Sequence, residues 1–310
     1  MRKVFFLDTV HSCLEDTLNQ KGFLCKHLYN ESLAEMSQEL HDAFGIVLRS
    51  RLSIDKVFLN HTPHLKFIAR SGSGLENIDV QECNNRGIEV ISSPEGNADA
   101  VGEHCLGLLL ALTNKIPQAN SSVRNFEWER EKHRGFELKG KTIGLIGYGH
   151  MGRAFAKRLS GFDCIVLAHD KYLKNFSDNH AREATLEEIF EKSDVVSIHL
   201  PLSEETHGYV NSIFLNQFKK NIVLLNTARG NHIVVKDLIE ALHIGKVTHC
   251  GLDVLPFEKK SLESLNPGPE FEQLLHFENV IFTPHVAGWT KESYLKLSQV
   301  LADKIISRYC

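Results

Sequence analysis

Short apolar runs alternate along this chain with longer segments of mixed polarity, a pattern typical of parallel β-strands joined by helices. In the first third of the chain, strand-like runs cover residues 3–8, 44–48, 67–69 and 88–91. Leu14 and Leu18 lie about one helical turn apart and predict a helix after the first run. Helical or turn segments separate the other runs, and the pattern predicts a first α/β unit that ends near residues 94–97.

The alternation resumes after two helical segments, one rich in Ala, Leu and Gly over residues 101–112 and a more polar one over 118–130. Six apolar runs follow, which is the number of strands in a Rossmann fold. They cover residues 143–146, 164–168, 194–200, 222–226, 250–254 and 280–283. Further helices are predicted over residues 185–190, where Thr185 and Glu188 match a capping box, over 235–242 and over 290–309.

The length and composition fit a folded protein of two domains. A chain of 310 residues exceeds one typical domain, and 42% hydrophobic with 24% charged residues is ordinary for a globular protein. The formal net charge of −4 does not suggest binding to nucleic acid or to an anionic membrane surface. The longest apolar run, residues 105–112, is too short to span a bilayer. We therefore expect neither nucleic acid nor a membrane as a partner.

Seven cysteines are scattered along the chain without any C-x-x-C spacing. Their odd number and their spacing favour reduced thiols in the cytoplasm over disulfides or zinc, and no metal site is predicted. The first apolar run ends at Asp8, so we interpret the N-terminus as a strand rather than a signal peptide.

The most informative stretch reads KTIGLIGYGHMG and contains G-x-G-x-x-G at Gly147, Gly149 and Gly152. An apolar run precedes it and a helical pattern follows, which is the context that a dinucleotide-binding fingerprint requires. Gly147 allows a tight turn, Gly149 lets a pyrophosphate approach the backbone, and Gly152 lets the helix pack on the strand. The helix N-terminus offers free N–H groups to the phosphates, so we include His150 and Met151 among the cofactor-binding residues.

An acidic residue about twenty positions farther on completes this fingerprint. The next apolar run ends just before Asp170, whose carboxylate can accept hydrogen bonds from a ribose 2′-hydroxyl and would repel a 2′-phosphate. His169 and Lys171 flank it and weaken this discrimination. The sequence therefore predicts a dinucleotide cofactor, with NAD favoured over NADP.

A second nucleotide motif overlaps the first, because GFELKGKT at residues 135–142 satisfies the P-loop pattern G-x-x-x-x-G-K-T. A P-loop follows a strand and opens a helix, whereas this segment follows a charged stretch and leads into a strand. Its amides would point the wrong way for a triphosphate. We therefore do not predict nucleoside triphosphate binding here.

The fold class that follows is α/β, with two doubly wound parallel-sheet domains, the second a Rossmann dinucleotide-binding domain inserted into the first. The fingerprint strand arrives only after roughly 140 residues, so another domain has to precede the Rossmann unit. We expect residues 1–98 plus 286–310 to form a flavodoxin-like, substrate-binding domain. Residues 99–285 are expected to form the NAD-binding Rossmann domain.

Ligands of open parallel sheets bind beyond the carboxyl ends of the strands, and the last three predicted strands are each followed by a reactive side chain. These side chains are Arg229, Glu258 and His285. Arginine can grip a carboxylate with two parallel hydrogen bonds, and histidine can pass a proton near neutral pH. A nearby glutamate would favour the charged imidazolium. Each residue alone could be an ordinary surface or structural group, so the prediction rests on their joint position.

These motifs resemble those of the D-isomer-specific 2-hydroxyacid dehydrogenases, over essentially the whole chain. The ordered matches are SGSGLENID at residues 71–79, Gly96-Asn97 with VGEH at 101–104, the glycine fingerprint with Asp170, HLPL at 199–202 with Thr206, NTARG at 226–230, GLDV at 251–254 and TPHVAG at 283–288. So many matches in one order are highly specific for the family.

The resemblance implies reversible hydride transfer between NAD(H) and a small 2-keto or 2-hydroxy acid. Arg229 matches the arginine that orients the acid, His285 the general acid/base, and Glu258 the glutamate that pairs with it. Asp253 matches the aspartate that contacts the nicotinamide amide. The remaining cofactor-binding residues that the resemblance implies are His199, Pro201, Thr206, Thr227, Ala228 and Gly288.

The substrate carboxylate is expected to bind backbone amides of a loop in the first domain. The residues implied there are Ser71, Gly72, Ser73, Gly74 and Asn97. One departure from the family concerns the position after Glu258, where the family usually has proline and this chain has Lys259, with Pro256 lying earlier. This departure leaves the pose of Glu258 open.

Three arginines bear on the identity of the acid. Arg49 and Arg70 resemble the phosphate-binding residues of the D-3-phosphoglycerate dehydrogenases in this family, and Arg130 resembles the arginine that reaches the neighbouring subunit's site. Several arginine forks suit a phosphate. We therefore expect the 3-phosphoglycerate/3-phosphohydroxypyruvate couple of serine biosynthesis, in a short form without a regulatory domain. Glycerate with hydroxypyruvate or glyoxylate is the alternative, in which these arginines are surface charge.

A protein of another class also has to be considered. Transcriptional corepressors that resemble this family use NADH binding to assemble, and they keep the same Arg, Glu and His. The sequence contains no evident disordered tail or peptide motif, which favours an enzyme. As in the family, the helices over 101–112 and 118–130 are expected to form the interface of a homodimer.

Overall fold

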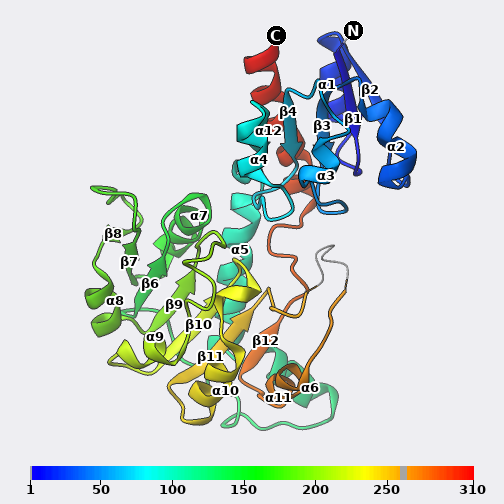
Figure 1. Ribbon diagram of the computed structural model, residues 1–310. Coiled ribbons are helices and arrows are strands. Elements are labelled where there is room, and N and C mark those ends of the chain that lie inside the picture. Colours follow the sequence, from blue (N-terminus) through cyan, green and yellow to red (C-terminus); the bar gives the residue numbers. More distant parts are fainter. Residues whose placement is uncertain (1, 259–263) are drawn as a thin grey trace. The chain divides into compact units, whose positions relative to one another are not determined.

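The computed structural model describes residues 2–258 and 264–310, which form two compact units (Figure 1). The first unit takes the chain up to Asn97 together with Ser264 and Trp289–Cys310. The second unit takes Ala98–Glu258 and Leu265–Gly288. The C-terminal segment of the chain therefore belongs to the first unit, although the whole second unit separates the two in sequence.

The first unit is built on a parallel sheet of five strands in the order β2-β1-β3-β4-β5. The strands are β1 (Arg2–Phe6), β2 (Phe23–His27), β3 (Ala43–Leu48), β4 (Phe67–Arg70) and β5 (Glu89–Ser92). Its helices are α1 (Cys13–Gln20), α2 (Leu33–Leu40), α3 (Lys56–Leu59), α4 (Val80–Asn85) and α12 (Lys291–Tyr309). This strand order is the one found in flavodoxin-type sheets.

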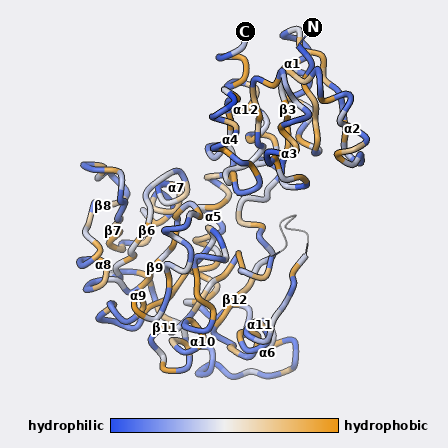
Figure 2. Tube along the Cα trace, in the orientation of Figure 1, coloured by the Kyte–Doolittle hydropathy of each residue, from blue (hydrophilic) through white to orange (hydrophobic). Residues whose placement is uncertain are grey.

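Both faces of this sheet are buried, because successive side chains of a strand point to opposite faces. Val4 and Phe6 of β1 lie in one apolar cluster, which also contains Leu301 and Ile305 of α12, whereas Phe5 lies in another. The hydropathy colouring of Figure 2 shows the same arrangement, with apolar stretches along the inner strands of the unit and polar stretches in its outer turns. The last helix therefore completes the core of the first unit.

The second unit is built on a parallel sheet of seven strands in the order β12-β11-β10-β9-β6-β7-β8. The strands are β6 (Thr142–Ile146), β7 (Ile165–His169), β8 (Arg182–Glu183), β9 (Val195–Ile198), β10 (Ile222–Asn226), β11 (Val247–Leu252) and β12 (Val280–Phe282). Counted from β6, this is the Rossmann order 3-2-1-4-5-6 with one strand added beyond the sixth. The prediction of two parallel-sheet α/β domains is confirmed.

In the part of the chain that the structure describes, two helices precede the first strand of the second unit, and five others lie between its strands (Figure 1). They are α5 (Pro94–Thr113), α6 (Ile116–Arg124), α7 (His150–Arg158), α8 (Leu186–Lys192), α9 (Ser212–Gln217), α10 (Val235–His243) and α11 (Pro269–Leu275). The boundary between the two units falls within α5, whose first four residues belong to the first unit.

The sequence pattern misses two strands, β2 and β8, and both are edge strands of their sheets. In β2 only Phe23 is buried, and β8 consists of Arg182 and Glu183 alone. An edge strand pairs on one side only and buries less apolar surface than a central strand, so its sequence lacks a continuous apolar run. A pattern based on apolar runs therefore finds the sheet centres and loses their borders.

Several predicted elements differ in their ends from the observed ones. The predicted helix over 118–130 is observed as α6 and ends at Arg124, because Phe126 adopts a left-handed backbone with φ +63°. The strand predicted over 250–254 is observed as β11 and ends at Leu252, which leaves Asp253 just beyond it. The helix predicted over 101–112 is observed as the longer α5.

The predicted capping box of α8 forms only in part. Thr185 caps the helix by accepting the backbone N–H of Glu188 at 3.3 Å. The Glu188 carboxylate pairs instead with Arg182 at 2.5 Å and with Lys192 at 2.8 Å. These ion pairs lower the pKa of Glu188 to about 2. Because its carboxylate binds Arg182 and Lys192, it does not complete the capping box.

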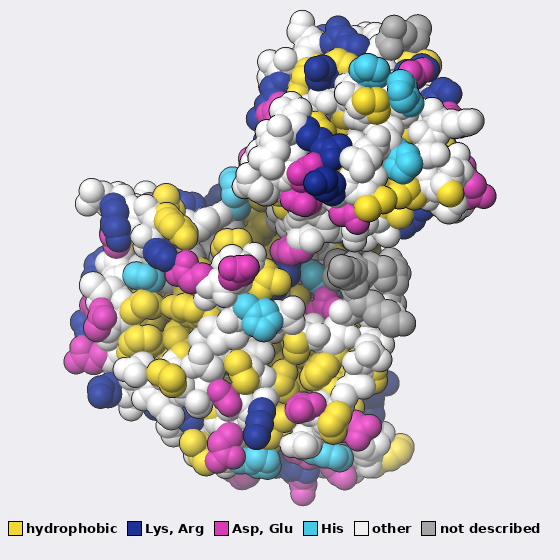
Figure 3. All heavy atoms as spheres, viewed as in Figure 1, with side chains coloured by type: hydrophobic (Ala, Val, Ile, Leu, Met, Phe, Trp, Pro, Cys, Tyr) yellow, Lys and Arg dark blue, Asp and Glu magenta, His cyan; other side chains and the backbone are white. Residues whose placement is uncertain are grey.

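Lys, Arg, Asp and Glu side chains intermix over the visible face of each unit (Figure 3). All seven cysteines are free thiols. None of the helices formed by residues 2–258 and 264–310 is long and apolar enough to cross a membrane. Across these same stretches of chain, no group of three or more His, Cys, Asp or Glu is arranged to hold a metal ion.

Candidate active site

The glycine turn after β6 depends on two glycines that the fold itself requires. Gly147 has φ +97°, a conformation that favours glycine, and a Cβ there would lie 2.5 Å from the carbonyl oxygen of His199. A Cβ at Gly152 would overlap the carbonyl oxygen of Gly147. The first turn of α7 can therefore pack tightly on the end of β6. The overlapping P-loop pattern ends on the first residue of β6, so it opens a strand and not a helix.

Gly149 differs from these two glycines, because a Cβ there would meet no protein atom within 4 Å. It caps the N-terminus of α7 and is exposed, as is His150, while Met151 is half-buried. The first N–H groups of a helix have no partner within the helix, and the helix dipole favours an anion beside them. This end of α7 fits a pyrophosphate, with open space where the phosphate would approach the backbone.

Asp170 lies just beyond β7, and its carboxylate binds the glycine turn. Its Oδ2 accepts the N–H of Tyr148 at 2.9 Å, and its Oδ1 accepts those of Tyr172 and Leu173 at 3.0 Å each. Partial burial acts to raise the pKa of Asp170, but the three N–H donors outweigh it and hold the pKa below its usual value. The carboxylate is therefore ionised and can accept hydrogen bonds from hydroxyl groups.

An open hollow of about 300 Å³ lies beside Asp170. Its lining includes His169, Lys174 and Glu183, together with Leu186 from the first turn of α8. This volume is at the small end of the range for ligand pockets. The hollow is suited to the part of a dinucleotide next to a ribose bound by Asp170.

Tyr148 lies within the glycine turn and stabilises it through its buried side chain, a role that was not predicted from the sequence. Its side chain is fully buried, and its hydroxyl donates to the Asp178 carboxylate at 2.9 Å. The Arg153 guanidinium pairs with the same carboxylate at 3.1 Å and lies 4.5 Å from the centre of the Tyr148 ring. The turn is thus fixed by two aspartates, Asp170 at the Tyr148 backbone and Asp178 at its side chain.

The predicted cofactor residues after β9 lie in a loop that is held by hydrogen bonds of Thr206. Thr206 Oγ1 donates to the carbonyl of Pro201 at 2.7 Å and accepts the N–H of Ser203 at 2.8 Å. His199 forms a hydrogen bond of 2.9 Å through Nε2 to Ser197 Oγ. Burial lowers the pKa of His199 to about 4, so its ring is neutral at neutral pH.

The turn after β10 presents Arg229 at the carboxyl end of the strand. The buried Asn226 side chain closes this turn by donating to the Arg229 carbonyl at 2.9 Å and accepting the N–H of Ala228 at 3.1 Å. Arg229 Nη1 donates to the Ala228 carbonyl at 2.7 Å. Thr227 Oγ1 lies 3.1 Å from the buried Sγ of Cys105 on α5. The NTARG motif is therefore a rigid turn with a half-buried guanidinium at its tip.

The structure brings Glu258 and His285 together. Glu258 Oε2 lies 2.6 Å from His285 Nδ1, and the side chains are 16% and 23% exposed. The other oxygen of Glu258 accepts the N–H of Leu255 at 2.6 Å, which fixes the carboxylate. Because Nδ1 faces Glu258, Nε2 is the nitrogen left to exchange a proton with a ligand. Lys259, where the family usually has proline, lies outside the described residues.

His285 sits in a turn with an unusual backbone, at φ +54°. A non-glycine residue in the left-handed region is strained and persists only where its surroundings hold it. Its N–H donates to the carbonyls of Asp253 and Thr283 at 2.8 and 3.0 Å. In this turn the His285 ring contacts Glu258, so the residue with the left-handed backbone is also the candidate acid/base.

Asp253 organises the turn that carries His285. Only 1% exposed, it accepts the Thr283 hydroxyl at 2.5 Å through Oδ1. It also accepts the N–H groups of Val286 and Ala287 at 2.9 Å each. The sequence interpretation assigned Asp253 to the cofactor, and the observed contacts also make it the anchor of the turn that continues to Gly288.

His104 adds a residue to the site that received no role from the sequence. It lies on α5, and its Nε2 is 2.9 Å from Thr283 Oγ1 and 3.5 Å from Asp253 Oδ1. Its place in the VGEH match was the available signal, but its partners lie about 150 or more positions away along the chain.

In the first unit, the loop after β4 holds the predicted substrate residues. Gly72 has φ +145°, its N–H donates to Ser93 Oγ at 3.2 Å, and a Cβ there would overlap the Arg70 guanidinium. Ser73 Oγ donates to Asn97 Oδ1 at 2.8 Å. Arg70 therefore lies directly against Gly72, and a side chain at that glycine would displace it.

The remaining predicted substrate residues have simpler surroundings. The Ser71 N–H donates to the Leu48 carbonyl at 2.9 Å, and Gly74 is half-buried. Arg130 belongs to the second unit and is exposed. The three arginines assigned to the substrate are thus divided between the two units.

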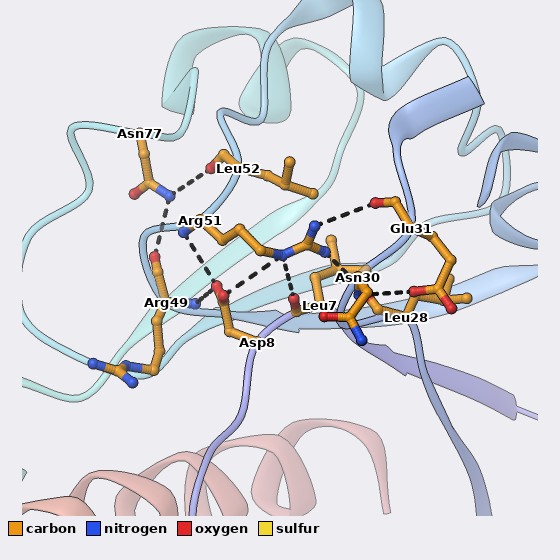
Figure 4. Close-up of polar contacts among 9 residues, drawn as sticks. All are labelled: Leu7, Asp8, Leu28, Asn30, Glu31, Arg49, Arg51, Leu52 and Asn77. Carbon is orange, nitrogen blue, oxygen red and sulfur yellow. Dashed lines mark hydrogen bonds and ion pairs between the residues drawn. The ribbon is translucent and has the colours of Figure 1, made fainter. Parts of the chain in front are cut away.

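The loop after β3 positions Arg49 through its backbone (Figure 4). Asp8 Oδ2 accepts the N–H of Arg49 at 2.6 Å, and Asn77 Nδ2 donates to the Arg49 carbonyl at 3.1 Å. The Arg49 guanidinium points away from these partners in Figure 4 and lies 4.2 Å from the centre of the Trp289 ring. Arg49 is therefore held in place and stacked, unlike a freely mobile surface side chain.

Arg51 supports the same loop and was not singled out from the sequence. Its guanidinium donates to the carbonyls of Leu7, Leu28 and Glu31 at 2.9, 2.7 and 3.2 Å (Figure 4). It also lies 3.8 Å from the Asp8 carboxylate. Arg51 joins the ends of β1 and β2 to the loop that bears Arg49.

Comparison with known proteins identifies a family. Residues 106–287 match the model for the NAD binding domain of D-isomer specific 2-hydroxyacid dehydrogenases. The chain is 33% identical over 307 residues to D-3-phosphoglycerate dehydrogenase of Archaeoglobus fulgidus, covering 98% of this chain and 57% of that protein. The chain thus spans little more than half the length of this relative.

Other relatives match along nearly their whole length. Hydroxypyruvate reductase of Thermotoga maritima is 35% identical over 280 residues, covering 90% of this chain and 88% of that protein. Among solved structures, the TT0316 protein from Thermus thermophilus aligns with a TM-score of 0.82 at 29% identity, covering 98% of this chain and 96% of the other.

Proposed function

The chain belongs to the D-isomer specific 2-hydroxyacid dehydrogenase family, and from this we propose that it is an NAD-dependent oxidoreductase that interconverts a 2-keto acid and a D-2-hydroxy acid. The observation that carries this proposal is the contact of 2.6 Å between Glu258 and His285, held in a strained turn at the carboxyl end of the second sheet. Such a pair is the acid/base half of a carbonyl reduction.

His285 gives the proton in this proposal. Its Nε2 protonates the carbonyl oxygen of the keto acid, while Glu258 at Nδ1 holds the ring in its orientation. In the reverse direction the neutral ring takes the proton from the hydroxyl group. NADH, when bound, supplies the hydride, so the protein itself has to hold the acid and move one proton.

Arg229 binds the carboxylate of the acid in this proposal. Its guanidinium stands at the tip of a turn closed by Asn226, so it is oriented before a ligand arrives. A guanidinium can form two parallel hydrogen bonds with a carboxylate, which fixes the plane of the acid. The loop after β4, in the first unit, is retained in the proposal as a group of substrate-binding residues.

NAD is the cofactor we propose, and the second unit has the features that it needs. Open space at Gly149 fits a pyrophosphate, and the ionised Asp170 suits the hydroxyl groups of an unphosphorylated ribose. The predicted cofactor residues of the second unit, from Gly147 to Gly288, are retained in the proposal.

For the substrate we propose the couple of 3-phosphoglycerate and 3-phosphohydroxypyruvate, and hence a role in serine biosynthesis. Support comes from Arg49, which is pinned by Asp8 and stacked on Trp289, and from Arg70 beside Gly72. Two oriented guanidinium groups suit a phosphate better than a small neutral tail. The similarity to a D-3-phosphoglycerate dehydrogenase agrees with this choice.

Glycerate with hydroxypyruvate or glyoxylate is the second candidate couple. It is favoured by the hydroxypyruvate reductase of Thermotoga maritima, because that relative matches over 88% of its own length. In this case Arg49 and Arg70 would have no phosphate to bind.

A homodimer in the cytoplasm completes the proposal. Ile116, Val123, Phe126 and Trp128 are 55%, 53%, 100% and 79% exposed, so the segment from α6 onward carries an apolar surface that a partner would cover. Arg130 follows this surface directly and is proposed to reach the partner's site. The free thiols suit a reducing compartment. Light scattering that gives the mass of a monomer would contradict the dimer.

The deciding experiment follows NADH oxidation by the purified protein with 3-phosphohydroxypyruvate, hydroxypyruvate and glyoxylate at matched concentrations. We expect the highest kcat/KM with the phosphorylated acid, and a loss of about tenfold or more in Arg49→Ala and Arg70→Ala. Arg86→Ala is the matched control, because Arg86 lies in the same unit but pairs with Glu82.

Each other outcome of this experiment points to a different protein. Preference for an unphosphorylated acid, unaffected by the arginine variants, would establish the glycerate and glyoxylate alternative. NADH binding without turnover of any acid would instead favour the NADH-sensing corepressor-like class.

A further inference from the structure

The turn that carries His285 is supported by a second histidine, His104, which has no part in the proposed reaction. His104 reaches it from α5, with Nε2 at 2.9 Å from Thr283 Oγ1 and at 3.5 Å from Asp253 Oδ1. The His104 side chain is 23% exposed, while that of Asp253 is completely buried. A buried carboxylate needs hydrogen-bond donors, and here they come from two distant parts of the chain.

The direction of the protons in this cluster follows from the donor inventory. The Thr283 hydroxyl donates its one proton to Asp253 Oδ1 over 2.5 Å. Thr283 Oγ1 therefore has no proton left for His104 and accepts instead. His104 has to present an N–H at Nε2, and the chain of donors runs from His104 through Thr283 to Asp253.

This series of hydrogen bonds holds the backbone next to the His285 ring. The carbonyl of Asp253 accepts the N–H of His285 at 2.8 Å, and its carboxylate accepts that of Val286 at 2.9 Å. The left-handed backbone of His285, at φ +54°, keeps its shape only while these acceptors stay in place. A rotation of Thr283 or Asp253 would therefore move His285 relative to Glu258.

We propose that His104 is a positioning residue for His285. Its Nε2–H fixes the Thr283 hydroxyl, which in turn fixes the Asp253 carboxylate and the turn bound to it. His104 touches neither the acid nor the cofactor in this scheme. The proposal rests on the proposed function only in that His285 is the acid/base there.

Two substitutions and a control test this role. His104→Leu removes the donor with little change in volume, whereas His104→Gln can still present an N–H near the position of Nε2. His133→Leu is the matched control, because His133 is also half-buried and also forms a hydrogen bond of 2.9 Å to a hydroxyl, that of Ser122. The control removes the same kind of bond from the same unit without touching the His285 turn.

We expect His104→Leu to lower kcat about tenfold, because small misplacements of a catalytic group slow the reaction without weakening binding. The KM values and the NADH dissociation constant should stay unchanged, and the solvent deuterium isotope effect on kcat should rise as proton transfer becomes slower. His104→Gln should recover most of the loss, and His133→Leu should behave as the unsubstituted protein.

Hydrogen exchange gives a readout that does not depend on turnover. The amides of Val286 and Ala287 should exchange about tenfold faster in His104→Leu than in His133→Leu. Unchanged kcat and exchange in His104→Leu would overturn the proposal, as would a loss in His104→Gln equal to that in His104→Leu. If the unsubstituted protein reduces no acid, the proposed function fails, while the exchange rates still decide whether His104 holds the turn.

Discussion

The turn that carries His285 in the second unit and the turn that carries Arg49 in the first are held in the same way. In each, an aspartate just beyond one strand accepts backbone N–H groups from the turn after the neighbouring parallel strand. Asp253 follows β11 and binds the turn after β12, and Asp8 follows β1 and binds the turn after β3. The carboxyl edge of a parallel sheet thus fixes its own functional turns.

The two turns differ in how completely their aspartates are enclosed. Asp253 has no exposed side-chain surface and receives a hydroxyl group and two N–H groups, while Asp8 is 14% exposed and faces Arg51. A proton donor has to lie within hydrogen-bond reach of its target, whereas the attraction of a guanidinium for an anion falls slowly with distance. The more deeply buried aspartate, Asp253, therefore supports His285, the side chain that has to be placed more precisely, and the less buried Asp8 supports Arg49.

The substitution with the largest expected effect is His285→Ala. We expect kcat to fall by about 10³, within the usual range for loss of a general acid, while NADH binding stays the same. Steady-state kinetics and a fluorescence titration with NADH measure the two quantities. Turnover equal to that of the unsubstituted protein would show that the precise turn serves no proton transfer.

The next test compares the two aspartates directly. Asp253→Asn should lower the free energy of unfolding by about 3 kcal/mol, because it disturbs a fully enclosed carboxylate, and Asp8→Asn by about 1 kcal/mol. Urea denaturation followed by circular dichroism gives both values. Asp42→Asn is a suitable control, since Asp42 is exposed and pairs with Lys3 at the surface. Equal losses at Asp253 and Asp8 would remove the distinction between the turns.

The stability of the second unit in acid tests a histidine of another kind, because His199 contacts the Ser197 hydroxyl and, among the residues that the structure describes, no carboxylate. Burial lowers its pKa from 6.5 to about 4, so the unfolded chain binds more protons than the folded one between these values. Stability should therefore fall as the pH drops from 6.5 to about 4, by at most about 1.4 kcal/mol per pH unit from this group. The slope should be shallower in His199→Gln, and an identical slope would mean that His199 does not contribute.

The smallest expected effect concerns Trp289, the platform for Arg49. Trp289→Ala removes a cation–π contact at a partly exposed site, which should raise the KM for the phosphorylated acid about threefold without changing kcat. Hydroxypyruvate serves as the comparison substrate, because it lacks the phosphate. An equal rise in KM for both acids would mean that Trp289 acts on the fold and not through Arg49.

The sequence predicts those parts of the molecule whose information is local. The central strands are continuous apolar runs, and the glycine turn is a strand, a spaced set of glycines and a helix in direct succession. The positions of Arg229, Glu258 and His285 after successive strands also follow from the pattern, because parallel strands bring their ends to one edge.

Contacts between distant residues could not be predicted in this way. Nothing near His104 in the chain indicates that its ring meets Thr283, and the alternation of β1 does not reveal that Arg51 binds carbonyls at the ends of two strands. These bonds depend on side-chain directions and on which helix covers which strand. The left-handed backbone of His285 is likewise set by acceptors from another strand and not by its own residue type.

Gly149 illustrates how the three glycines of one motif can be under different evolutionary pressures. Gly147 and Gly152 are tied to the protein's own atoms, so their replacement would be opposed by selection for folding alone. At Gly149 the neighbouring space is open and φ is −79°, which alanine adopts readily, so folding does not demand a glycine there. Its persistence in a lineage would therefore record continued use of the ligand, and its drift to alanine would be an early sign that a descendant had lost the cofactor while keeping the fold.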